Sequence, residues 1–154
     1  MSMKTLEEEH IAFKRAMITE NIFLNHNYLR VTKACSPVLN MLGGGNGLYH
    51  YLFTDICWLI FLNHELLMIT EKTENVKSDF DYSMLRISYK NITEFLIEKV
   101  PFWGQHCLKV KTNQKTMYFY IDVDSILSMS CMDFSSVNFR FLLENDFNGL
   151  LTSK

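Results

Sequence analysis

The chain has 154 residues, 48% of them hydrophobic and 21% charged, which suits a single globular domain spanning residues 1–154. Its formal net charge of −2 offers no basic surface of the kind that nucleic-acid binding requires, so we expect no nucleic-acid partner. The aromatic share is 14%, with 12 Phe and 7 Tyr, which favours β structure.

The N-terminal sequence MSMKTLEEEH is acidic and polar, so it is not expected to be a secretory signal. Four cysteines occur without a C-x-x-C pair: Cys35, Cys57, Cys107 and Cys131. This pattern is typical of reduced thiols in a soluble, cytoplasmic protein. The uncharged stretch 34–54 contains Pro37 and four glycines, so we expect no stable membrane insertion.

The first predicted element is an amphipathic helix at roughly residues 6–19. Thr5 and Glu8 have the spacing of a capping box, in which the Thr5 hydroxyl accepts from the Glu8 amide and the Glu8 carboxylate reaches back. Spacings of four, three and four residues place four side chains on one face: Leu6, His10, Phe13 and Met17. We expect this face to pack on the protein, with His10 partly buried and satisfied.

Residues 21–33 fit a second helix, although the segment 28–32 would also serve as a strand. We favour the helix because of the spacing of three apolar residues, Leu24, Tyr28 and Val31. The glycine-rich connector Gly43–Gly47 then separates a helical N-terminal extension, residues 1–47, from a sheet that begins at residue 48.

The segment 48–72 is predicted to be the central hairpin of that sheet. Ile56–Leu62 is a run of seven apolar residues, and a second apolar run, Leu66–Ile69, follows after Asn-His-Glu at 63–65. Apolar runs of this length, separated by turn formers, favour buried strands over helices.

Further strands are predicted at residues 83–88, 91–100, 107–112 and 115–122. Alternation places Phe95 and Ile97 on one face of their strand, and Leu108 and Val110 on one face of theirs. Short strands joined by tight turns indicate an antiparallel meander.

A closing helix is predicted to start at a cap provided by Asp133 or Ser135. We expect four apolar residues to share its buried face: Phe134, Val137, Phe141 and Leu142. The fold class is therefore α+β, with helices before and after an antiparallel bent sheet.

Three segments, Leu62–Leu67 (LNHELL), Tyr89–Ile92 (YKNI) and the hairpin Leu108–Tyr120, give the chain a pattern that resembles the bacterial pleckstrin-homology-like domains. The resemblance covers about residues 48–148. It implies a strongly bent antiparallel barrel, closed at one end by the C-terminal helix. In eukaryotic relatives, loops bind phosphoinositides through basic residues, but Gly43–Gly47 carries no Lys or Arg, so we do not expect that activity here.

Reactive constellations are not expected. Cys57 and Cys107 lie in apolar segments, where burial raises a thiol pKa, and no G-x-S-x-G occurs. The histidines form no H-x-x-x-H pair and the glycines lack the Gly-Lys-Ser/Thr of a phosphate loop. We therefore expect no enzymatic activity, no metal and no cofactor; an enzyme would need convergent polar groups such as His50, Tyr51 and Asp55.

The feature most indicative of binding is the turn Pro-Phe-Trp-Gly at residues 101–104. Aromatic anchors of this kind are enriched in interface hot spots. If exposed, they would have a polar rim, so the predicted binding residues are Phe102, Trp103, Lys99, His106 and Lys109. The alternative is that both rings fold back and plug the barrel mouth.

We predict a non-catalytic binding or scaffolding module that acts through a protein partner or through homo-oligomerisation. The nine methionines, whose flexible side chains adapt to varied partners, are compatible with this. The alternative is a barrel that binds a lipid or small ligand in a cavity lined by residues such as Phe53, Trp58, Phe61 and Tyr118.

Overall fold

The structure is a computed structural model that describes residues 5–42, 55–72, 80–100, 106–121 and 133–151. The elements in chain order are α1 (Leu6–Thr19), β1 (Tyr28–Ala34), α2 (Pro37–Leu42), β2 (Asp55–Phe61), β3 (Glu65–Glu71), β4 (Tyr82–Ser88), a 3-10 turn (Tyr89–Asn91), β5 (Ile92–Lys99), β6 (His106–Thr112), β7 (Thr116–Ile121) and α4 (Asp133–Glu144). The prediction of an α+β protein is confirmed.

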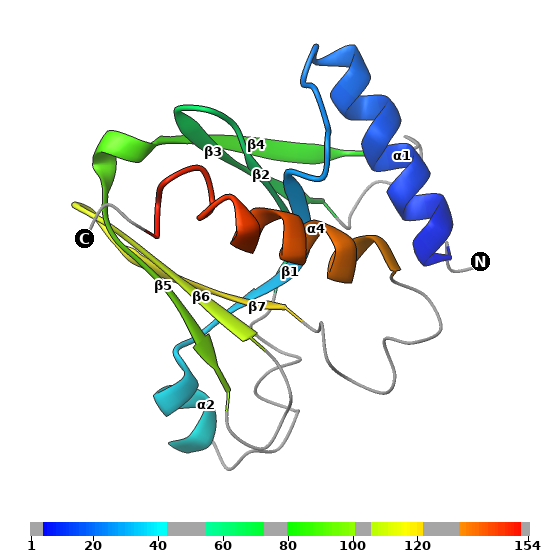
Figure 1. Cartoon of the computed structure of the whole chain (residues 1–154). Helices are drawn as coiled ribbons and strands as arrows, with labels where there is room; N and C mark the ends of the chain where they lie inside the picture. Colours follow the sequence, from blue (N-terminus) through cyan, green and yellow to red (C-terminus); the bar gives the residue numbers. More distant parts are fainter. Residues whose placement is uncertain (1–4, 43–54, 73–79, 101–105, 122–132, 152–154) are drawn as a thin grey trace.

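The described strands form one antiparallel sheet in the order β4-β3-β2-β1-β7-β6-β5. The sheet is strongly bent, and α4 lies inside the bend (Figure 1). β4 and β5 are its two edges, so the sheet is not closed into the barrel that the resemblance implied.

The predicted central hairpin is confirmed. β2 pairs with β3 from Cys57↔Thr70 to Phe61↔Leu66, and the chain reverses between them. Every residue from Cys57 to Phe61 is at most 1% exposed. An unbroken apolar run is needed here because both faces of these strands are covered, so alternate side chains enter two separate cores.

The inner core lies between the concave face of the sheet and α4. Its strand residues come from each of the described strands, and Phe139, Leu142, Phe147 and Leu150 join it from α4 and the turn after α4. The predicted inward residues Phe95, Leu108 and Val110 are buried here, and Ile97 is partly buried.

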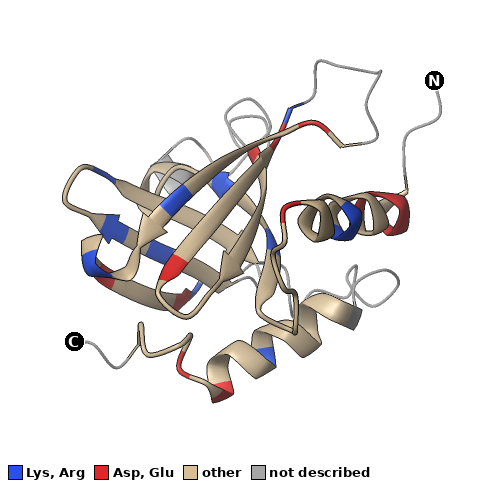
Figure 2. Cartoon of the chain, turned by 90° about the horizontal axis from the view of Figure 1, so that it is seen from above, with Lys and Arg blue, Asp and Glu red and all other residues tan. Residues whose placement is uncertain are grey.

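The outer core lies on the opposite face, beneath α1. The Phe13 ring stacks on Trp58 at 4.0 Å between centroids, and Met17 is fully buried beside it. Figure 2 shows α1 and α4 against different parts of the sheet, with the acidic first turn of α1 near the N-terminus. The prediction that this helix packs through an apolar face is confirmed.

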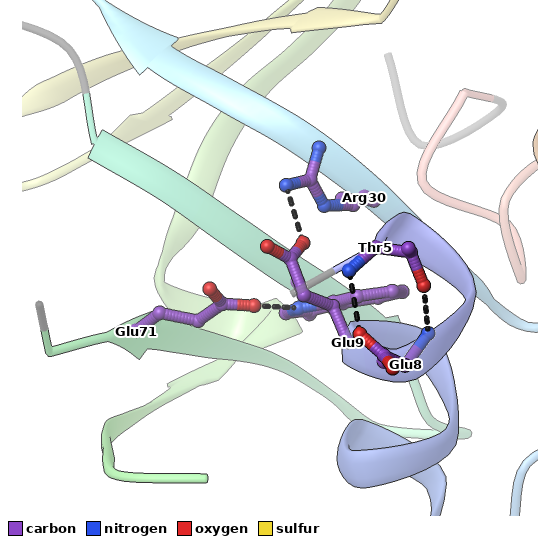
Figure 3. A network of polar contacts seen from close by, with 6 residues as sticks. Thr5, Glu8, Glu9, Arg30 and Glu71 are labelled. Carbon is purple, nitrogen blue, oxygen red and sulfur yellow. Dashed lines mark hydrogen bonds and ion pairs between the residues drawn. The ribbon is translucent and has the colours of Figure 1, made fainter. Parts of the chain in front are cut away.

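Polar contacts fix the N-terminal end of α1 (Figure 3). The predicted capping box is present: the Thr5 amide donates to Glu8 Oε2 at 2.7 Å, and the Glu8 amide donates to Thr5 Oγ1 at 3.3 Å. Glu9 then forms an ion pair with Arg30 of β1 at 2.8 Å. The capping box closes the start of the helix, and the ion pair joins its first turns to the sheet.

The helix predicted at residues 21–33 is wrong. Tyr28–Ala34 is strand β1, paired with both β2 and β7. Alternation decides this, because Leu29 and Val31 enter the inner core while Tyr28 enters the outer core. The sheet therefore begins well before residue 48, and β1 joins its two halves.

The buried face predicted for the closing helix is wrong in part: Leu142 is buried and Phe134 is partly buried, but the other two predicted residues are exposed. The helix itself, Asp133–Glu144, is confirmed. Asn138, Phe139 and Leu142 are buried, whereas Val137 is 51% exposed and Phe141 is 36% exposed. The polar Asn138 can face inward because its Nδ2 donates to the Tyr28 carbonyl at 3.0 Å. The buried face therefore includes Asn138 together with Phe139 and Leu142, and it differs from the face that apolar spacing alone indicated.

Candidate functional site

The candidate site is an open groove of about 560 Å³ between the edge strand β5 and α4. Its lining residues come from β5, the first residue of β6, α4 and the segment after α4: Phe95, Leu96, Ile97, Lys99, His106, Phe139, Leu143 and Leu151. Six of these eight side chains are apolar, and the groove is open to solvent.

The apolar floor follows from the pairing of β5 with β6. Alternation turns Phe95 and Ile97 of β5 toward α4, and Phe139 of α4 packs in the same core. Phe95 and Phe139 are nearly inaccessible, but Leu143, one turn after Phe139 on α4, is 40% exposed. Leu143 therefore forms an accessible apolar wall above a packed floor.

One end of the groove is polar. Lys99 and His106 are register partners at the end of the β5–β6 ladder, and both line the groove. The His106 ring lies 5.0 Å from the Phe139 ring, which places it at the boundary of the apolar floor. Lys99 is exposed, and none of the lining residues is acidic, so this end of the groove favours an anion.

Two of the five predicted binding residues, Lys99 and His106, thus lie together in the groove. Lys109 is not brought to them. It lies on the opposite face of β6, where its Nζ forms an ion pair with Glu94 Oε1 at 3.3 Å. Phe102 and Trp103 lie outside the described residues.

Sequence reasoning missed Leu143 and Leu151. Leu143 could have been found, because Phe139, Leu142 and Leu143 share a helical face that competes with the predicted one. Leu151 carries no comparable signal, since its position depends on the backbone of the turn after α4.

The residues predicted to line a cavity for a lipid or small ligand do not come together around one. Trp58 is stacked in the outer core and Phe61 is buried in the inner core, so the sheet separates them. Phe53 lies outside the described residues.

The cysteines that the sequence placed in strands are buried at Cys57 and Cys107. Burial raises the pKa of the Cys57 thiol, and burial together with Glu98 raises the pKa of Cys107 to about 12. Both side chains therefore remain neutral thiols, which are poor nucleophiles.

His10 packs against the aromatic residues of the outer core. The His10 ring nitrogen Nε2 lies 2.8 Å from the Tyr28 hydroxyl, and burial together with Lys14 lowers its pKa to about 4. Across the described ranges, no group of three His, Cys, Asp or Glu side chains is placed to hold a metal ion. His50 and Tyr51 lie outside those ranges.

No helix among the described residues is long and apolar enough to cross a membrane. No protein-family model and no curated protein sequence matches the chain. Among solved structures, the C-terminal domain of an unknown protein from Leishmania infantum is similar, with 12% sequence identity and a TM-score of 0.44, over 88% of this chain and 96% of that chain.

Proposed function

We propose that the chain is a non-catalytic binding module of the pleckstrin-homology-like type, whose groove takes an extended segment of a partner protein. The observation that carries this proposal is the coincidence of an apolar groove with an unpaired sheet edge: β5 pairs with β6 on one side and ends the described sheet on the other.

The edge of β5 presents backbone N–H and C=O groups that an added strand can pair with. Alternate side chains of such a strand would then face the groove, where Ile97 of the floor and Leu143 of the wall offer apolar contact. The cation at Lys99 favours a carboxylate at the corresponding end of the bound segment. The expected partner sequence therefore alternates apolar residues and ends in an acidic one.

A random-peptide phage library, selected on the full chain, tests this proposal. We expect enriched peptides to share the alternating apolar pattern with an acidic residue at one end. In binding measurements with the synthetic peptides, Leu143→Arg is expected to weaken affinity at least about tenfold, because it places a charge on the apolar wall.

The matched control is Val137→Arg, which changes an exposed apolar residue of the same helix that does not line the groove. Lys99→Glu is expected to weaken binding about threefold to tenfold, whereas Lys111→Glu, an exposed lysine of β6 outside the groove, leaves it unchanged. Failure to enrich any peptide, or equal loss in Leu143→Arg and Val137→Arg, would refute the proposal.

A lipid or small ligand is the second candidate, favoured by the volume of the groove and its apolar lining. Native mass spectrometry of the purified chain separates the two candidates. A bound small molecule that Leu143→Arg removes and Val137→Arg retains would favour the second, whereas ligand-free protein that binds the selected peptides would favour the first.

A further inference from the structure

The last two residues of β5 carry opposite charges on opposite sides of the sheet. Alternation puts Lys99 on the groove side, with Phe95 and Ile97, and it puts Glu98 on the outer side. Both charged side chains are exposed. Since β5 ends the described sheet, both charges lie beside the position that an added strand would take.

The outer side of β5 carries a second carboxylate, Glu94, which already has a cation. Lys109 Nζ lies 3.3 Å from Glu94 Oε1. The register partner of Glu98 on β6 is Cys107. Burial, followed by the charge of Glu98, raises the pKa of Cys107 to about 12, so this thiol stays uncharged. Across the β5–β6 ladder Glu98 therefore faces an uncharged group, and a strand added on the other side of β5 can bring a cation to it.

The β5 strand of a second copy does not carry the complementary charges. When two antiparallel strands pair around a two-fold axis, the residues that meet belong to the same side of the sheet. The outer side of β5 offers Glu94, Leu96 and Glu98, so Glu98 would meet no cation there. The groove side of β5 has no acidic residue to meet Lys99. The charges at this edge therefore favour a different segment over self-pairing.

We propose that the partner segment carries an acidic residue directly next to a basic one, paired with Lys99 and Glu98; this rests on the proposed function and names the partner's chemistry. Neighbouring residues of a strand face opposite sides, so the acidic side chain enters the groove beside Lys99 while the basic one lies beside Glu98. A slip by one residue brings a like charge against Lys99 or Glu98 and turns the apolar residues out of the groove. The charge pair thus fixes the register of the bound segment.

The order of the two charges also gives the direction of the segment. In an antiparallel segment the acidic residue comes first, the basic residue second, and the apolar residues that face Ile97 and Phe95 follow. In a parallel segment the apolar residues come first, and the basic residue precedes the acidic one. Either order satisfies both charges of β5.

The test uses synthetic peptides enriched from a random-peptide phage library on the full chain. We expect them to share an adjacent acidic–basic pair at one end of the alternating apolar pattern. Glu98→Lys is expected to weaken their binding about threefold to tenfold, because it replaces an attraction with a repulsion. A peptide whose basic residue is exchanged for Glu should recover that loss on the Glu98→Lys variant. Glu7→Lys, at an exposed glutamate of α1, is the control and leaves affinity unchanged.

Enriched peptides that keep the apolar pattern and the acidic residue but have no basic neighbour would overturn this inference and leave the proposed function standing. The same holds if Glu98→Lys binds the peptides as tightly as the wild type, or if the exchanged peptide recovers nothing. Failure to enrich any peptide would overturn both. Matching thermal unfolding midpoints of the variants and the wild type establish that the changes in affinity do not come from unfolding.

Discussion

The two long helices pack on the sheet in different ways. α1 is closed onto its face of the sheet: Phe13 and Met17 are fully buried, and the ion pair of Glu9 with Arg30 fixes its first turns. α4 buries Phe139 and Leu142 but leaves a groove beside β5 at its C-terminal end. Both faces of the sheet are therefore packed, but the face under α4 also keeps an opening that leaves some apolar surface exposed.

The largest expected loss of stability comes from replacing Trp58 on the α1 side of the sheet. Its side chain is fully buried, stacks on Phe13 and donates from Nε1 to Glu71 at 2.7 Å. Trp58→Ala is expected to lower the free energy of unfolding by about 3–5 kcal/mol, because it removes the transfer free energy of the ring and leaves a cavity. Urea unfolding followed by circular dichroism measures this.

Leu143→Ala on the groove side is the counterpart, with an expected loss below about 1 kcal/mol because the side chain is already solvated. If Trp58→Ala does not fold, Trp58→Phe provides a smaller truncation at the same site. Equal losses in Leu143→Ala and the Trp58 variant would show that the two faces contribute alike, contrary to the comparison.

The pH dependence of stability probes the α1 side through His10. Its ring stacks on Phe134 at 4.0 Å, and its pKa is lowered from 6.5 to about 4, first by burial and then by Lys14. Between these values the unfolded chain binds more protons than the folded one, so stability rises with pH. The stability that the neutral His10 ring contributes is fully present above pH 6.5, and it is lost as the pH falls toward about 4.

We expect the free energy of unfolding to change by about 1–2 kcal/mol over this pH range. This is less than the whole pKa shift of His10 would give, because solvent reaches part of the ring. Urea unfolding at several pH values measures it. The His10→Gln variant is expected to lose this part of the pH dependence, while His64→Gln, in the turn between β2 and β3, keeps it. A slope that His10→Gln leaves unchanged would assign the effect to other groups.

The sequence predicts a region well when residues close together in the chain determine its structure, and poorly when distant residues do. Ile56–Leu62 and Leu66–Ile69 identify the central hairpin because two short, uninterrupted apolar runs on either side of a turn fit paired, buried strands far better than a helix. The apolar residues of β1 satisfy the helical period as well as alternation, so the sequence alone favours the wrong element there. This segment is a strand because it lies between β2 and β7, and that position depends on distant residues.

The groove shows the same limit. Lys99 and His106 could be named in advance because they flank a single turn in sequence. Leu143 depends on which face of α4 turns inward, and that face includes Asn138, whose side chain bonds the distant Tyr28 carbonyl. Leu151 depends on a left-handed turn that includes Phe147, a residue with no local preference for positive φ.

The smallest expected effect concerns that turn. Asp146→Gly replaces a residue at φ 51° with the one residue that adopts this region without strain, so the variant is expected to be more stable by about 0.5–1 kcal/mol. The matched control is Glu144→Gly at the end of α4, where glycine weakens the helix by about the same amount. Thermal unfolding of both variants gives shifts of opposite sign if the turn is strained. A loss of stability in Asp146→Gly would show that Asp146 adopts its positive φ without strain.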